Sequence, residues 1–100
     1  MILALDLSTV WGQAFYLLAQ RLIEKLGHLL VSLVAMPDEG SMAYESNVLV
    51  VLKKAGVEEI RKVLRVKREV ELMFGDKVNI SPFITTPDDE VVEKYPGRWL

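Results

Sequence analysis

The sequence predicts an α+β domain in which helices pack on a small mixed three-stranded sheet. Two long segments carry apolar residues at three- and four-residue spacing, which is the pattern of a helix with one buried face. Two shorter segments are nearly continuous apolar runs bounded by Gly or Pro, which is typical of buried strands. The length of 100 residues suits one domain, so we expect a single domain over residues 1–100.

The first helix is expected over Ser8–Leu26. Ser8 or Thr9 is a suitable N-cap, and Gly27 is a suitable C-terminal stop. Polar residues fall mostly on the side opposite an apolar stripe formed by Trp11, Phe15, Leu18, Leu22 and Leu26. The breadth of the apolar surface predicts a helix that is well buried or that meets a partner chain.

Two buried strands are expected next, over His28–Met36 and Asn47–Lys53. The ten residues between them, Pro37–Ser46, are rich in Pro, Gly, Ser and acids. They predict a loop or one short helix that starts at Pro37.

A second amphipathic helix is expected over Val57–Phe74, ended by Gly75 and Asp76. The segment Val78–Ile84 alternates apolar and polar residues, and its Pro82 predicts an edge strand or a bend. The residues Thr86–Asp89 predict the start of a short helix that reaches about Tyr95. The expected order is therefore α-β-α-β-α-β, with that short helix at the end.

Composition excludes several classes of function. There is no cysteine, so disulfides, zinc-cysteine sites and thiol catalysis are excluded, and His28 alone cannot form a histidine metal cluster. A net charge of −2 makes nucleic acid an unexpected partner. No segment has the pattern of a signal peptide or a membrane span, so we expect a cytoplasmic protein without a membrane partner.

The segment from Leu33 to Lys54, LVAMPDEGSMAYESNVLVVLKK, carries a resemblance. It is similar to the minimal nucleotidyltransferases of the DNA polymerase β superfamily, whose first strand ends in Gly-Ser and whose second opens with Ser-Asp-x-Asp. Ala35-Met36 falls on the Gly-Ser pair, Gly40 on a later glycine, and Ser46-Asn47-Val48-Leu49 on the acidic signature. The resemblance covers about residues 10–95 and implies a nucleotidyltransferase-type fold.

The resemblance also implies where metal ions would bind, and the carboxylates are missing there. Phosphoryl transfer by this family uses two divalent metals, which need hard oxygen ligands and carboxylate charge. Asn47 and Leu49 stand at the first two carboxylate positions, and Asn79 or Ser81 stands at the third. We therefore expect no cofactor, and Mg²⁺ only if the chain is active.

The nucleotide-binding positions implied by the family are Met36, Gly40 and Ser46. Met36 adds bulk at the phosphate turn, Pro37 removes an N–H donor, and acids follow. A displaced cluster of Asp38, Glu39 and Glu45 could hold a metal, although these residues also suit a solvated loop.

The interpretation that follows is a degenerate nucleotidyltransferase-fold protein, without catalysis, that acts as an interaction or regulatory module. Its partner would be a second copy or a helical protein. Trp11, Phe15 and Trp99 are candidate contact residues, with core packing as the alternative for the first two. The alternative functions are an active, metal-dependent transferase of nucleoside monophosphates to a protein or small molecule, and a nucleotide sensor.

Two further interpretations stay open. The residues Ile2–Thr9 are similar to the first strand of RNase H-like or actin-like folds, with Asp6 as a metal or phosphate residue. The second is a basic surface that binds RNA or a nucleotide. Because acidic residues are interleaved with the basic ones, a solvated helix face is the alternative. The basic residues concerned are Lys53, Lys54, Arg61, Arg65, Lys67 and Arg68.

Overall fold

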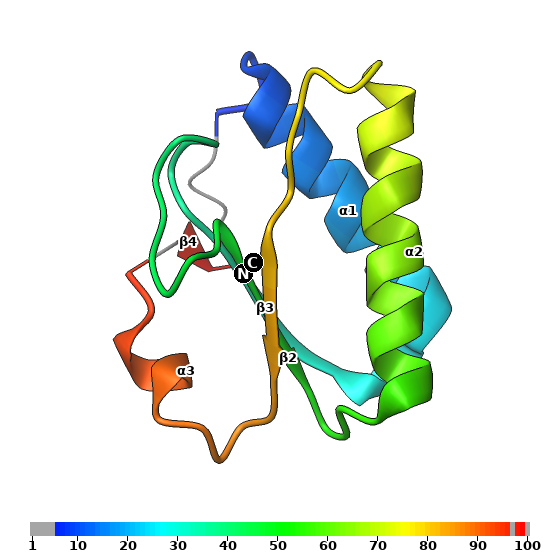
Figure 1. The fold of residues 1–100 in the computed structure, drawn as a ribbon, viewed down its shortest axis with the longest axis vertical. Helices are drawn as coiled ribbons and strands as arrows, with labels where there is room; N and C mark the ends of the chain where they lie inside the picture. The colour runs from blue at the N-terminus through cyan, green and yellow to red at the C-terminus, as the bar shows by residue number, and fades with distance from the viewer. Residues whose placement is uncertain (1–5, 97, 100) are drawn as a thin grey trace.

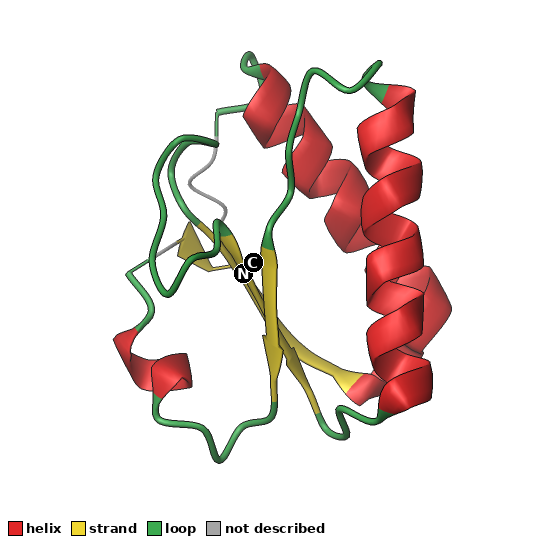
Figure 2. Cartoon of the chain, in the orientation of Figure 1, coloured by secondary structure: helices red, strands yellow, loops and turns green. Residues whose placement is uncertain are grey.

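The protein is a small α+β domain with a mixed sheet, as the sequence predicted (Figures 1 and 2). The structure is a computed structural model that describes residues 6–96 and the backbone of residues 98 and 99. Its elements in chain order are α1 (Val10–Leu26), the 3-10 helix η1 (Gly27–Leu29), β1 (Leu30–Ala35), β2 (Val48–Leu52), α2 (Val57–Met73), β3 (Pro82–Thr85), α3 (Val91–Lys94) and β4 (Arg98–Trp99).

The sheet has the strand order β3-β2-β1-β4. Strand β1 is antiparallel to both of its neighbours, whereas β2 and β3 are parallel. The parallel pair is possible because α2 crosses over between its two strands. Strand β3 is an edge strand, as Pro82 at its start predicted, since proline has no N–H to donate to a further strand.

The two faces of the sheet have different covers. Helices α1 and α2 pack on one face and form the larger core with Leu33, Val48 and Val50. The loop after β1 and α3 cover the other face (Figure 1). Leu49 and Val51 belong to the smaller core on that face. Alternate residues of β2 therefore serve two separate cores, which is why the whole strand is buried and apolar.

Helix α1 begins and ends where its flanking residues dictate. The Thr9 side chain accepts the N–H of Gly12, which confirms Thr9 as the N-cap. A side chain at Gly12 would place Cβ 2.0 Å from the carbonyl oxygen of Asp6, so only glycine fits there. Gly27 ends the helix with φ at 55°, a conformation that side chains disfavour.

Of the two alternatives for Pro37–Ser46, the loop is confirmed, since Asp38 binds the N–H and hydroxyl of Ser41 in a local turn. Three other expectations are corrected. The third strand is later and shorter than Val78–Ile84. The C-terminal helix begins at Val91, because Asp89 rather than Thr86 accepts an N–H of its first turn. A fourth strand pairs with the end of β1.

Within the described part of the chain, no helix combines the length and the hydropathy that crossing a bilayer would require.

Candidate functional site

Asn47, which the resemblance places at the first carboxylate position, lies immediately before β2, and its side chain is fully buried. The side-chain nitrogen donates to the carbonyl oxygens of Glu39 at 3.2 Å and of Asn79 at 2.9 Å. The side-chain oxygen accepts the N–H of Ser81 at 2.8 Å. One amide therefore joins the loop after β1, the start of β2 and the segment before β3. We call this set of contacts the Asn47 bridge.

Asn79, one of the two residues at which the resemblance would place the third carboxylate, lies beside Asn47. Its backbone, rather than its side chain, makes the contacts: Asn79 has an exposed side chain, and its N–H donates to the carboxylate of Glu39. Asn47 and Ser81 also form a backbone hydrogen bond of 3.0 Å. The strand ends thus meet at this point, but the groups that meet there are amides and carbonyls.

Leu49, which the resemblance places at the second carboxylate position, has no exposed surface. It lies in the smaller core with Val34, Met36 and Tyr95, and α3 packs against that core. The position offers no oxygen, and apolar side chains fill the space around it.

Of the three candidate nucleotide-binding positions, Met36 and Ser46 form hydrogen bonds within the chain, and Gly40 is exposed. The N–H of Met36 donates to Asn47, and its carbonyl oxygen accepts the indole N–H of Trp11 at 2.9 Å. Ser46 is buried, and its hydroxyl donates to the carbonyl of Ala43. Gly40 is exposed, and a Cβ there would make only an ordinary contact of 3.5 Å, so no close approach requires this glycine.

The acids of the loop do not assemble into a metal site. Across the described residues, no group of three or more Asp, Glu or His side chains is placed to hold a metal ion. Asp38 binds Ser41, Glu39 binds the backbone of Asn79, and Glu45 is exposed at the tip of a turn. The displaced cluster of Asp38, Glu39 and Glu45 is therefore not formed.

The tip of the loop is a strained two-residue turn that the sequence did not predict. Ala43 and Ser46 exchange two backbone hydrogen bonds of 2.9 and 3.0 Å, while Tyr44 and Glu45 have φ at 54° and 59°. Turns of this kind favour Asn-Gly, since other residues are strained at positive φ. The turn stacks the half-exposed Tyr44 ring on Tyr95 with centroids 6.4 Å apart.

Tyr95 ties α3 to the same loop. Its hydroxyl donates to the carbonyl oxygen of Ser46 at 3.2 Å and lies 3.2 Å from the Ser46 hydroxyl. Burial raises the pKa of Tyr95, so the ring carries a neutral O–H donor near pH 7.

A buried carboxylate, Glu71, fastens α2 to the segment before β3. It accepts the N–H of Ile80 at 2.8 Å and pairs with Lys67 at 3.0 Å and Arg68 at 3.4 Å. Burial acts to raise the pKa of Glu71, but the Ile80 N–H and the Lys67 ammonium outweigh it, so the pKa is lowered. The charge pattern of α2 had predicted only a solvated helix face. The spacing of residues within the helix could not show that Glu71 contacts Ile80.

Two of the three candidate contact residues are core residues. Phe15 has no exposed surface and Trp11 only 6%. Both lie in the larger core, so core packing is the correct interpretation and neither offers a free surface. The side chain of Trp99 lies outside the described residues.

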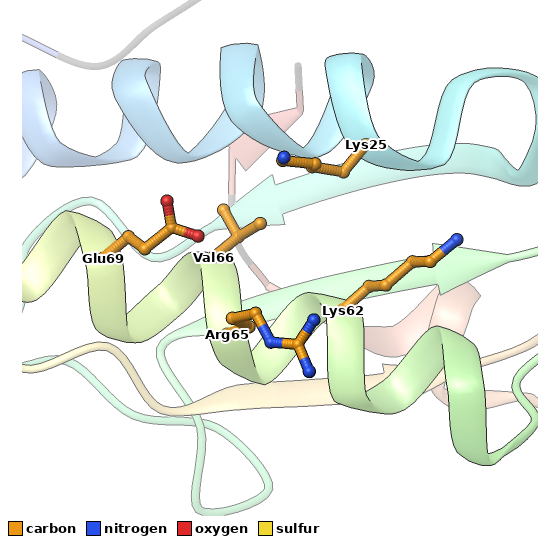
Figure 3. Close-up of a pocket in the computed structure, with 5 residues that line it drawn as sticks. All are labelled: Lys25, Lys62, Arg65, Val66 and Glu69. Atoms are coloured by element: carbon orange, nitrogen blue, oxygen red, sulfur yellow. The ribbon is translucent and has the colours of Figure 1, made fainter.

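A shallow pocket of about 200 Å³ lies between the outer sides of α1 and α2. Lys25 reaches it from α1, and α2 lines it with Lys62, Arg65, Val66 and Glu69 (Figure 3). Its glutamate pairs with Arg21 at 3.8 Å. The three cations of the pocket take part in none of the ion pairs found within residues 6–96.

The remaining candidates have local roles. The carboxylate of Asp6 accepts the N–H of Ser8 in the turn before α1, and this bond lowers the pKa of Asp6. Residues 6–9 are thus not a strand, while residues 1–5 of the RNase H-like segment lie outside the described residues. Within the basic surface, Lys67 and Arg68 are paired with Glu71.

No protein-family model, no curated protein and no solved structure matches this chain.

Proposed function

We propose that the chain is a degenerate nucleotidyltransferase-fold protein that does not transfer phosphoryl groups and acts through protein interaction. The Asn47 bridge is the observation that carries the proposal. At the position where the family would bind a cation between carboxylates, a neutral amide donates to two carbonyl oxygens. Its hydrogen-bonding groups are committed to the backbone of the same chain.

The second inherited position supports the same conclusion. Leu49 is enclosed by apolar side chains, and a metal ion there would have to displace the small core beneath α3. Mg²⁺ needs several hard oxygen ligands, including charged ones. The oxygen-bearing groups nearby, on Glu39 and Ser46, already accept or donate hydrogen bonds.

Calorimetric titration with ATP in the presence of Mg²⁺, and separately of Mn²⁺, tests the proposal. We expect no binding tighter than about 1 mM at the inherited site. A triphosphate could still associate with the cationic pocket between α1 and α2, so the matched control is the double variant Lys62→Gln/Arg65→Gln. Metal-dependent binding that persists in this variant would overturn the proposal and favour the active enzyme or the sensor.

A further inference from the structure

Charges are unequally divided between the two sides of the sheet. The loop at 37–46 and the segment at 86–96, which cover one side, contain seven acidic residues and one lysine. Helices α1 and α2, on the other side, contain seven cationic and five acidic residues. The protein is thus polarised across its sheet, although its net charge is only −2.

The acidic side also carries an apolar anchor. We define the acidic surface as Tyr44 and Met42 with the exposed acids Glu45, Asp88, Glu90 and Glu93. Tyr44 and Met42 are 47% and 50% exposed, and Phe83 and Tyr95 pack against the Tyr44 ring. A half-exposed aromatic ring on the same side of the sheet as these acids suits a cationic partner, because that side offers both a ring face and carboxylates to a guanidinium. Of the four acids, Glu90 also pairs with Lys94 at 3.6 Å.

The opposite side offers such cations. We define the basic groove as Lys25, Lys62 and Arg65 around the buried Val66. Arg65 and Lys62 are exposed on α2, and Glu69 is engaged by Arg21. The groove is therefore a cationic surface with an apolar floor, opposite in charge to the acidic surface.

Resting on the proposed function, we infer that the acidic surface of one copy docks in the basic groove of a second copy. The contact is heterologous, because the two surfaces are different and lie on opposite sides of the sheet. Each docked copy leaves one surface of either kind free, so association continues head to tail unless the ring closes. Charge dominates both surfaces, so the association is weakened by salt.

Sedimentation velocity over a range of protein concentrations tests this inference. In about 50 mM NaCl the weight-average mass rises with concentration above twice the 11.3 kDa of the monomer, and in about 500 mM NaCl it falls toward the monomer. A monomer under both conditions overturns the inference. It leaves the proposed function standing, because that proposal fails only on metal-dependent nucleotide binding.

Two double variants separate the surfaces. Lys62→Gln/Arg65→Gln removes the groove cations, Glu45→Gln/Glu93→Gln removes two acids, and each alone weakens self-association by about tenfold or more. Mixed together, the two variants form a 1:1 dimer and nothing larger, since one intact surface of each kind remains. Self-association that survives in either variant, or a mixture that stays monomeric, contradicts head-to-tail docking.

The matched control is Lys53→Gln/Lys54→Gln. Like the groove variant, it removes two positive charges, but from exposed residues that do not line the pocket. It retains the self-association of the unaltered protein. An equal loss in this control shows a general charge effect and overturns the assignment to the groove.

Discussion

Replacing Asn47 by aspartate introduces the carboxylate that the proposed family would have at this position, and it should be strongly destabilising. The new oxygen would take the place of the side-chain nitrogen, 3.2 Å and 2.9 Å from two carbonyl oxygens. Two donated hydrogen bonds become two repulsive contacts, while the bond from the Ser81 N–H is retained. The site is fully buried, so water cannot compensate.

The magnitude follows from these contacts. A buried carbonyl left without its donor costs about 1–3 kcal/mol, and a buried charge left without a partner costs about 3–5 kcal/mol. We expect Asn47→Asp to lower the free energy of unfolding by about 4 kcal/mol at pH 7. That is a large part of the roughly 5–15 kcal/mol typical of a domain.

The dependence on pH gives a second, independent check. Burial against carbonyl oxygens would raise the pKa of the new aspartate above its unfolded value of about 4. A raised folded pKa means that protonation favours the native state, so the deficit shrinks as the pH falls through that pKa. The protonated acid also regains one donor for Asn79 or Glu39.

Urea unfolding followed by tryptophan fluorescence measures both effects, because Trp11 is buried in the native state. We expect the midpoint at pH 7 to fall by about 2 M. Asn47→Ala is the uncharged control: it loses the two donated bonds and also the bond from the Ser81 N–H, and it should show no recovery in acid. An Asn47→Asp protein as stable as the original, or one rescued by Mg²⁺ or Mn²⁺, would refute the bridge as described.

Three further substitutions and one ligand experiment follow from the structure. Glu71→Gln should lower the free energy of unfolding by about 1–3 kcal/mol at pH 7. The pKa of Glu71 is lowered in the folded state, so the stabilisation by its carboxylate is present above the unfolded pKa and lost in acid. In urea titrations, this variant should therefore lose less stability than the original protein between about pH 5 and 3. Glu45→Gly should stabilise by about 1 kcal/mol and raise the melting temperature by about 4–8 °C in calorimetry, because it relieves a positive φ; no increase would show that the turn is unstrained. Trp11→Phe should cost about 2 kcal/mol in urea unfolding, because the carbonyl oxygen of Met36 loses its indole donor, and a neutral effect would contradict that bond. Exchanging Mg²⁺ for EDTA should leave the melting temperature unchanged, and a shift of several degrees would indicate a metal site.

The helices and the buried strands could be predicted from the sequence because their signals are local. Each signal is contained in a short stretch of sequence: the apolar stripe of α1, the apolar run of β2 and the helix stop at Gly27. The position of β3 was less predictable, because Val78 and Ile80 are as apolar as strand residues. They are buried beneath α2 through the contact of Ile80 with Glu71, outside the sheet ladder.

The candidate site was predictable as a location and not as a structure. Asn47 and Asn79, two residues that the resemblance singled out, are in contact in the structure. It could not show that the contacts run through the backbone of Asn79 rather than its side chain. The strained turn at Tyr44 and Glu45 was also hidden, because neither residue type signals a positive φ.

Under the proposed function, the Asn47 bridge holds the chain segments together at the position where the family would bind ions. Carboxylates at converging strand ends repel one another unless a cation lies between them. An amide that donates to two carbonyls joins the same segments without any net charge, and it needs no ligand. Once the loop over the sheet is held in this way, its outer side no longer has to admit a nucleotide. It can then present Tyr44 and its acids to a partner, which is the surface whose docking the sedimentation experiment tests.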